Sequence, residues 1–194
     1  MNKNRLEAFS DGVLAIIITI MVLEFKVPHG SDWKQLEELI PVFISYGLSF
    51  SYIGIYWGNH HHLLHSVKEV SSTMILSNLN LLFWLSLVPF ATAWMGENHF
   101  ETNTVAMYGA VLLLCGTAYY MLQETVKKNS KDSDALKEAF KMSSRKGMIS
   151  LVMYILAIPL AYVHPYISYG IFIVSSIMWL IPDKNIEKAL KAEK

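Results

Sequence analysis

The chain has 194 residues, of which 53% are hydrophobic and 12% aromatic, and its acidic and basic residues balance to a net charge of zero. A mean hydropathy of +0.34 with no long polar tract is typical of an integral membrane protein. Zero net charge removes the electrostatic argument for binding nucleic acid, so no such partner is expected. The lone Cys115 excludes an internal disulfide.

The first membrane-length stretch, residues 5–26, has an apolar run too short to cross a bilayer unaided. Only twelve uncharged residues separate Asp11 from Glu24, about 18 Å of helix against a hydrocarbon core of about 30 Å. If this segment spans, Ser10 and Asp11 lie at membrane depth, where a carboxylate needs protein partners or a water-filled cavity. We therefore expect this helix inside a bundle. A signal peptide is the weaker alternative, because Asp11 interrupts the apolar run and residues 24–28 offer no small-x-small cleavage site.

Three further spans are predicted before the main polar segment. A short interfacial helix should begin after Ser31 as its N-cap. The spans themselves carry almost no charge, and each is long enough to cross a bilayer. They are residues 39–62, 70–96 and 102–124, and we expect each to be one crossing.

The polar segment from Glu124 to Lys146 is predicted to be a connecting loop, although its apolar spacing hints at an amphipathic surface helix. Beyond it, 36 uncharged residues run to Pro182, about 54 Å if helical and too long for one crossing. His164-Pro165 divides this run into spans 147–163 and 166–182. The sequence thus predicts an all-α polytopic membrane protein with six transmembrane helices.

The distribution of lysine and arginine supports the count of six spans. An even number of spans puts both termini, and the loops after the second and fourth spans, on one side of the membrane. All but two of the 16 lysines and arginines then fall on that side, the exceptions being Lys26 and Lys34. By the positive-inside rule, this side is the cytoplasm. We predict a single domain, residues 1–194, multi-pass in the plasma membrane with both termini cytoplasmic.

A seven-residue motif lies at the start of the first span. Arg5-x-x-x-Phe9-Ser10-Asp11, followed by an isoleucine-rich run, resembles the signature of the bacterial and endolysosomal six-helix potassium channels named for their Phe-Ser-Asp motif. Those channels lack the Thr-Val-Gly-Tyr-Gly filter, and so does this chain. The resemblance implies a homotetramer whose first helices line a central pore for potassium and other monovalent cations. It implies no cofactor and no enzymatic activity.

A second pattern lies at the end of the second span. Trp57-x-x-His60-His61 is similar to a Trp-x-x-His-His pattern of the bacterial members of that family. Asn78 and Asn80 in the third span are either helix–helix contacts or part of the same polar network. Pairing of the motif aspartate with the motif arginine or with these histidines is a further hypothesis.

Helical geometry places an aliphatic stripe opposite the motif carboxylate. At about 100° per residue, Ile16 lies about 140° from Asp11, Ile20 about 180° and Leu23 about 120°. By the family's pattern, Ile16 aligns with the constriction isoleucine, and Ile20 and Leu23 continue the lining. The position of Thr19, about 80° from Asp11, would let its hydroxyl border the pore. A ring of isoleucines offers no oxygen to a cation, so selectivity must come from partial dehydration, which favours potassium over sodium only weakly. The same ring can dewet and act as the gate.

Three other interpretations stay open from the residues alone. The aliphatic stripe is compatible with ordinary helix packing. His61 and His65 have the i, i+4 spacing of metal ligands, which would suit a membrane metalloenzyme or a metal carrier. A polar helix end is the simpler interpretation, and we assign no metal site. A proton-coupled carrier would use Asp11 as its relay.

Overall fold

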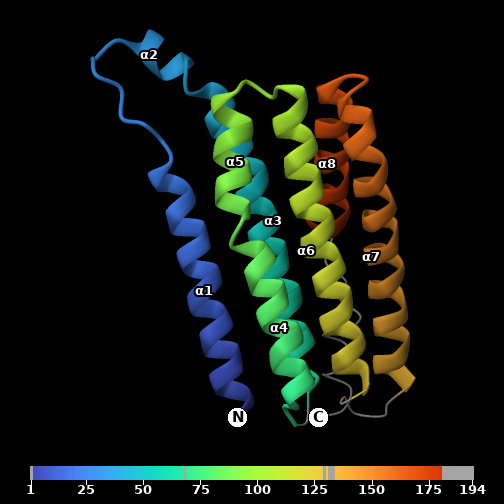
Figure 1. The fold of residues 1–194 in the computed structure, drawn as a ribbon. Coiled ribbons are helices and arrows are strands. Elements are labelled where there is room, and N and C mark those ends of the chain that lie inside the picture. Colours follow the sequence, from blue (N-terminus) through green and yellow to red (C-terminus); the bar gives the residue numbers. More distant parts are fainter. Residues whose placement is uncertain (1, 68, 129, 131–133, 181–194) are drawn as a thin grey trace.

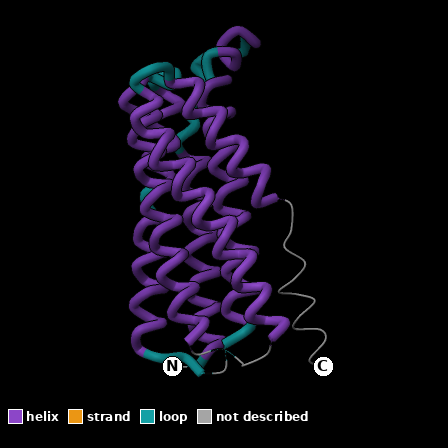
Figure 2. The backbone as a smooth tube through the Cα atoms, turned by 90° about the vertical axis from the view of Figure 1, so that its right-hand side faces the viewer, coloured by secondary structure: helices purple, strands orange, loops and turns teal. Residues whose placement is uncertain are grey.

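The computed structural model describes residues 2–67, 69–128, 130 and 134–180, and within them the chain forms an elongated bundle of helices running up and down (Figure 1). The tube view shows the same bundle from the side, with loops only at its ends and at one break within a span (Figure 2). The helices are α1 (Lys3–Leu23), α2 (Trp33–Glu37), α3 (Ile40–His65), α4 (Ser72–Leu85), α5 (Val88–Glu97), α6 (Thr102–Lys128), α7 (Asp134–Ala161) and α8 (Pro165–Leu180).

Five stretches of the described chain are long and apolar enough to cross a membrane, with α4 and α5 together forming one of them. The shorter α8 is also apolar. No described residue belongs to a strand, and an isolated antiparallel bridge pairs Val67 with Ser130. The predicted fold class, an all-α polytopic membrane protein, is confirmed.

The helices are arranged around α6. It packs against α4, α5, α7 and α8, and more than half of its apolar window is buried. At one edge, α1 packs mainly against α3, α4 and α5, and at the other edge α7 packs against α6 and α8 (Figure 1). The N-terminus and the ends of α6 and α7 that face each other lie at the same end of the bundle (Figure 1).

The third predicted span, residues 70–96, is not one continuous helix. The structure breaks it after Leu85, and α5 starts at Val88 with Pro89 in its first turn. Proline has no N–H to donate, and its ring clashes with the carbonyl one turn earlier, which lies at the end of α4. Pro89 therefore ends one helix and starts the next within a single crossing.

The predicted loop from Glu124 to Lys146 is largely helical. α6 continues to Lys128, and α7 begins at Asp134. The reason is the amphipathic pattern, because Ala139 and Phe140 are only 2% and 3% exposed and join the hydrophobic core. The predicted loop interpretation was wrong, and the surface helix is an extension of the fifth span.

Two smaller boundaries also differ from the sequence-based expectation. Asp32, not Ser31, occupies the N-cap position of α2, and its side chain makes no capping hydrogen bond. The last described residue of α8 is Leu180. The predicted end of the sixth span at residue 182 and the basic tail lie outside the described residues.

Hydroxyl groups join the central helices inside the bundle. The Thr92 hydroxyl of α5 donates to Ser49 Oγ of α3 over 2.7 Å, and Ser49 Oγ lies 2.9 Å from the Tyr108 hydroxyl of α6. All three residues are buried. Such interhelical hydrogen bonds stabilise membrane bundles, where helix association has no hydrophobic driving force.

Candidate functional site

The aliphatic stripe of α1 is uncovered in the single chain. Ile16, Ile20 and Leu23 are 58%, 41% and 79% exposed. Leu14 and Ile17, on the face of α1 that joins the bundle, are 2% and 3% exposed and pack into the core. The helix therefore uses one face to join the bundle and leaves the other for something outside the chain.

Thr19 shares the uncovered face. Its hydroxyl donates to the carbonyl of Ile16 over 3.0 Å, one turn earlier in the same helix. The oxygen keeps lone pairs that a water or a cation could use, while the proton is committed to the backbone.

The Asp11 carboxylate binds the second span. Trp57 Nε1 of α3 donates to Asp11 Oδ1 over 3.0 Å. Arg5 and Phe9, the other motif residues, are exposed, Phe9 to 53%. The sequence suggested that Asp11 pairs with Arg5 or with the histidines, whereas its hydrogen-bond donor in the structure is the tryptophan of the Trp-x-x-His-His pattern.

A buried hydrogen-bonded chain links α1 to α3 and α4 one residue before that carboxylate. Asn78 Nδ2 donates to Ser10 Oγ over 2.9 Å, and Ser10 in turn donates to the carbonyl of Leu6 over 2.8 Å. His60 Nε2 lies 2.7 Å from Asn78 Oδ1. Because an amide oxygen only accepts, His60 Nε2 carries the proton and donates. The three side chains are at most 1% exposed, so this chain holds α1 at a defined height against its neighbours.

The remaining residues of the predicted polar network lie around these hydrogen bonds between Ser10, Asn78 and His60. His61 Nδ1 forms an ion pair with Glu7 Oε1 over 2.8 Å when the imidazole is protonated. Asn80 is half-buried on α4, and its side chain makes no hydrogen bond to this network in the described part of the chain. The ring of His61 lies 6.3 Å from that of His65, centroid to centroid. Within the described residues, no three histidine, cysteine or acidic side chains are grouped as a metal site.

Sequence reasoning missed Glu7 as a contact residue. Glu7 lies one helical turn before Asp11, so the spacing i, i+4 places both carboxylates on the side of α1 that faces α3. That spacing is the signal that could have found it. Each of the two carboxylates then meets a member of the Trp57-x-x-His60-His61 pattern, Asp11 the tryptophan and Glu7 the second histidine.

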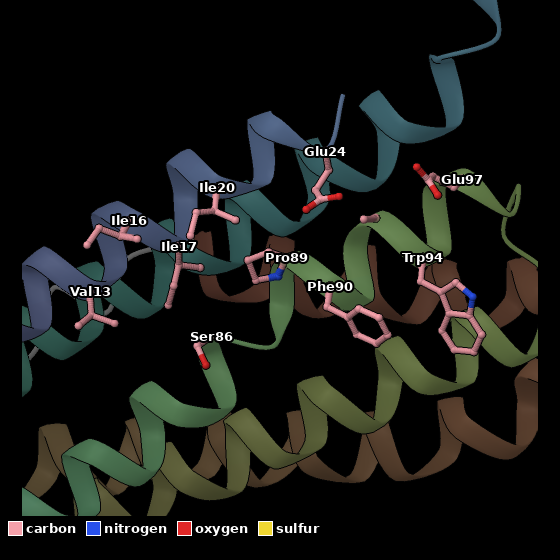
Figure 3. Close-up of a pocket in the computed structure, with 11 residues that line it drawn as sticks. Val13, Ile16, Ile17, Ile20, Glu24, Ser86, Pro89, Phe90, Trp94 and Glu97 are labelled. Carbon is pink, nitrogen blue, oxygen red and sulfur yellow. The ribbon is translucent and has the colours of Figure 1, made fainter. Parts of the chain in front are cut away.

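A groove of about 610 Å³ runs between α1 and the break of the third span. Val13, Ile16, Ile17 and Ile20 line one side (Figure 3). The other side holds Ser86, Pro89, Phe90, Ala93 and Trp94, and Glu24 and Glu97 lie at its outer end (Figure 3). The break at Pro89 thus leaves an apolar groove beside the aliphatic stripe. The sequence analysis did not predict this groove.

The comparisons with known proteins agree on one family. The family model described as "Endosomal/lysosomal potassium channel TMEM175" matches residues 5–89. A potassium channel of Chryseobacterium sp. (strain P1-3) is 51% identical over 191 residues, which cover 98% of this chain and 99% of the relative. The mouse endosomal/lysosomal proton channel TMEM175 is 28% identical over 141 residues, which cover 64% of this chain and 28% of the mouse protein.

A solved structure has the same fold. The crystal structure of a lysosomal potassium-selective channel TMEM175 homolog from Chamaesiphon minutus matches with a TM-score of 0.81 and 25% sequence identity. The match covers 93% of this chain and 97% of that one.

Proposed function

The chain belongs to the TMEM175 family of potassium channels, and from this premise we propose that it is a potassium-selective cation channel whose pore is lined by α1. The resemblance carried by Arg5-x-x-x-Phe9-Ser10-Asp11 is confirmed at the level of the family. Because the family is one of ion channels and not of enzymes, the metalloenzyme interpretation of the histidine cluster no longer applies.

The exposed stripe of α1 is the observation that carries the proposal. Ile16, Ile20 and Leu23 are uncovered, while Ser10 and Asp11 on the same helix are held by α4 and α3. Lipid is a poor partner for this face, because the uncharged run is about 18 Å long against a hydrocarbon core of about 30 Å. Copies of the same helix around an axis would cover the stripe and enclose a water-filled path. That water would solvate the charged residues at the two ends of the short apolar run.

The pore would be formed by four copies of the chain, each contributing one α1. Ile16 is the proposed constriction, Ile20 and Leu23 extend the apolar lining, and Thr19 adds a hydroxyl to its border. An ion passing four isoleucines must shed part of its hydration shell, and potassium loses water more easily than sodium. The resulting selectivity is weak, and the ring closes by dewetting when it narrows.

The polar residues of α1 act as anchors in this proposal. Asp11 is bound to Trp57 and Ser10 to Asn78, on the side of the helix away from the stripe. A register shift of α1 would break both contacts and move Ile16 along the pore axis. The Phe-Ser-Asp motif therefore sets the height of the constriction, while the carboxylate stays out of the conduction path.

The ion and the orientation rest on the relatives and the charge distribution. The relative from Chryseobacterium that matches nearly the whole chain is named a potassium channel, whereas the mouse relative is named a proton channel. We assign potassium on the fuller match. The N-terminus and the basic ends of α6 and α7 lie at one end of the bundle, which the positive-inside rule places in the cytoplasm of a plasma-membrane protein (Figure 1).

The test is the reversal potential of the Ile16→Asn variant under bi-ionic potassium and sodium conditions. An amide at the constriction wets the ring and removes the dehydration barrier, so the potassium preference should fall toward equal permeability. Ile155→Asn on α7 is the matched control, because Ile155 is 55% exposed and lies on a helix that does not line the proposed pore. An unchanged reversal potential in the Ile16 variant would refute the assigned constriction.

Flux through liposomes separates a channel from the carrier alternative. A channel passes potassium downhill with no proton gradient, and the flux does not saturate at moderate concentration. A carrier that used Asp11 as a relay would couple potassium movement to a proton gradient. Potassium uptake that stops when the proton gradient is abolished would contradict the channel assignment.

A further inference from the structure

A basic pocket lies between the facing ends of α6 and α7. Its volume is about 520 Å³. The described residues that line it include four lysines, two serines and one aromatic ring, and no carboxylate: Lys127, Lys128, Ser130, Lys137, Phe140, Lys141 and Ser144. A concave surface with this lining matches a phosphate group, which takes up positive charge and hydroxyl hydrogen bonds.

Contacts within the chain shape the pocket. Lys127 Nζ donates to Ser144 Oγ over 2.8 Å and also binds Glu124, so the charge of this ammonium group is offset by a carboxylate behind the lining. Gln123 Nε2 donates to the Phe140 carbonyl over 3.2 Å and to Ser144 Oγ over 2.9 Å, which ties α6 to α7. The pocket wall therefore does not depend on a ligand to bring the two helices together.

The backbone of Ser130 is also held. The isolated bridge to Val67 connects it to the end of α3, and its hydroxyl donates to the carbonyl of Lys127 over 3.0 Å. Ser130 Oγ keeps its lone pairs, whereas Ser144 Oγ already accepts two hydrogen bonds and has its own proton to donate.

The depth of the pocket matches the headgroup layer of a bilayer. α6 has 27 residues and α7 has 28. Each is therefore about 40 Å long, against a hydrocarbon core of about 30 Å, so the last turns of α6 and the first turns of α7 extend among the lipid phosphates. By the positive-inside rule this end belongs to the cytoplasmic leaflet.

One face of α7 continues from the lysines to exposed apolar side chains. At about 100° per residue, Lys137, Lys141, Met148, Val152 and Ile155 fall within an arc of about 60°. The three apolar side chains are 48%, 50% and 55% exposed. A molecule with a phosphate at one end and a hydrocarbon tail fits this face, whereas a soluble phosphate uses only the basic end.

We propose that this pocket binds the phosphate of an anionic phospholipid of the cytoplasmic leaflet, with an acyl chain lying along Met148, Val152 and Ile155 of α7. The lysine ammonium groups neutralise the phosphate, and the Ser144 hydroxyl donates to one of its oxygens. The site lies away from α1, so it does not depend on the proposed pore.

The test is native mass spectrometry of the full-length protein in detergent with added phosphatidylglycerol or phosphatidylcholine bearing the same acyl chains. Phosphatidylglycerol should bind more tightly. Each lysine near a lipid surface changes affinity about five-fold, so Lys137→Gln with Lys141→Gln should weaken phosphatidylglycerol binding about 25-fold. Lys26→Gln with Lys34→Gln removes the same charge at the opposite end of the bundle and should leave binding unchanged.

The single variant Lys141→Gln, with an expected loss of about five-fold, keeps the test decisive if the double variant does not fold. Equal binding of the two lipids, or full retention of phosphatidylglycerol by the basic-pocket variants, would overturn the proposal. Displacement of phosphatidylglycerol by millimolar inorganic phosphate would also overturn it, because the pocket would then be a site for a soluble anion.

Discussion

The helices α1 and α7 lie at opposite edges of the bundle and are buried to a similar, small extent, 28% and 22% of their apolar windows (Figure 1). Both expose aliphatic side chains, yet their polar residues differ. α1 carries Asp11 within its membrane-length helix, bound to α3, whereas α7 carries lysines near one end that can extend to the headgroup layer. The exposure of a helix face does not identify what covers that face. The position of charged residues along the same helix does.

The largest expected effect comes from cutting the buried chain that holds α1. Asn78→Leu removes the partner of Ser10 and leaves the buried His60 Nε2–H without an acceptor. An unsatisfied buried donor costs about 1–3 kcal/mol, so thermal melting in detergent should show a clear loss of stability. Asn80→Leu on the same helix is the control and should melt near the wild-type temperature. Equal losses in the two variants would show that Asn78 does not anchor α1.

A pair of tryptophan variants compares the two edges directly. Trp57→Phe removes the donor to the Asp11 carboxylate. Trp179→Phe on α8 removes a donor to the neutral hydroxyl of Ser150 on α7, which lies 2.8 Å from the indole nitrogen. Hydrogen bonds to charged groups are the stronger ones, but Trp57 is half exposed, so we expect a loss of about 1 kcal/mol for Trp57→Phe and less for Trp179→Phe. Melting curves of both variants supply the measurement. A larger loss for Trp179→Phe would mean that the motif carboxylate is not the stronger anchor.

The smallest expected effect is at the outer end of α1. Lys26 Nζ lies 2.7 Å from Glu97 Oε1, and this hydrogen bond and charge raise the pKa of the Lys26 ammonium above 10.5. The ion pair therefore stabilises the fold at pH values below the ordinary pKa of lysine, and this stabilisation is lost as the pH rises through the raised pKa. Because Lys26 is exposed, Lys26→Gln should barely change the melting temperature, and salt should erase any difference. A large, salt-independent loss would mean that this contact is shielded from solvent, for example by another copy of the chain.

Much of the fold follows from the sequence because membrane-length apolar runs leave few alternatives. Charge-free stretches predicted the five membrane-length helical stretches and the shorter apolar α8, and the motif at Arg5-x-x-x-Phe9-Ser10-Asp11 predicted the family. The polar segment from Glu124 to Lys146 was misinterpreted because it was judged by its charge, whereas Ala139 and Phe140 bury one face of a helix there. A helix that extends beyond the bilayer needs polar residues on its other faces, so charge does not separate it from a loop.

The contacts of the candidate site were less predictable than its position. Helical geometry placed Asp11 away from Ile16, Ile20 and Leu23, and the structure buries the intervening face and leaves the stripe exposed. The partner of Asp11 depends on how α3 is rotated, which no single-sequence pattern states. The groove beside α1 depends on the break at Pro89, whose effect in a membrane helix ranges from a slight kink to a full interruption.

Thiol accessibility in reconstituted membranes tests most directly whether the stripe of α1 faces the ion path. The native Cys115 is fully buried, so its thiol should not react with an aqueous reagent. Single cysteines replacing Ile16, Ile20 and Leu23 can therefore be tested one at a time, with Ile155→Cys on α7 as the lipid-facing control. A membrane-impermeant, charged thiol reagent should block potassium current through the α1 variants, Leu23→Cys fastest because it lies nearest the proposed pore mouth, and should leave Ile155→Cys unaffected. Unblocked current in all three α1 variants, with labelling only by lipid-soluble reagents, would contradict the account.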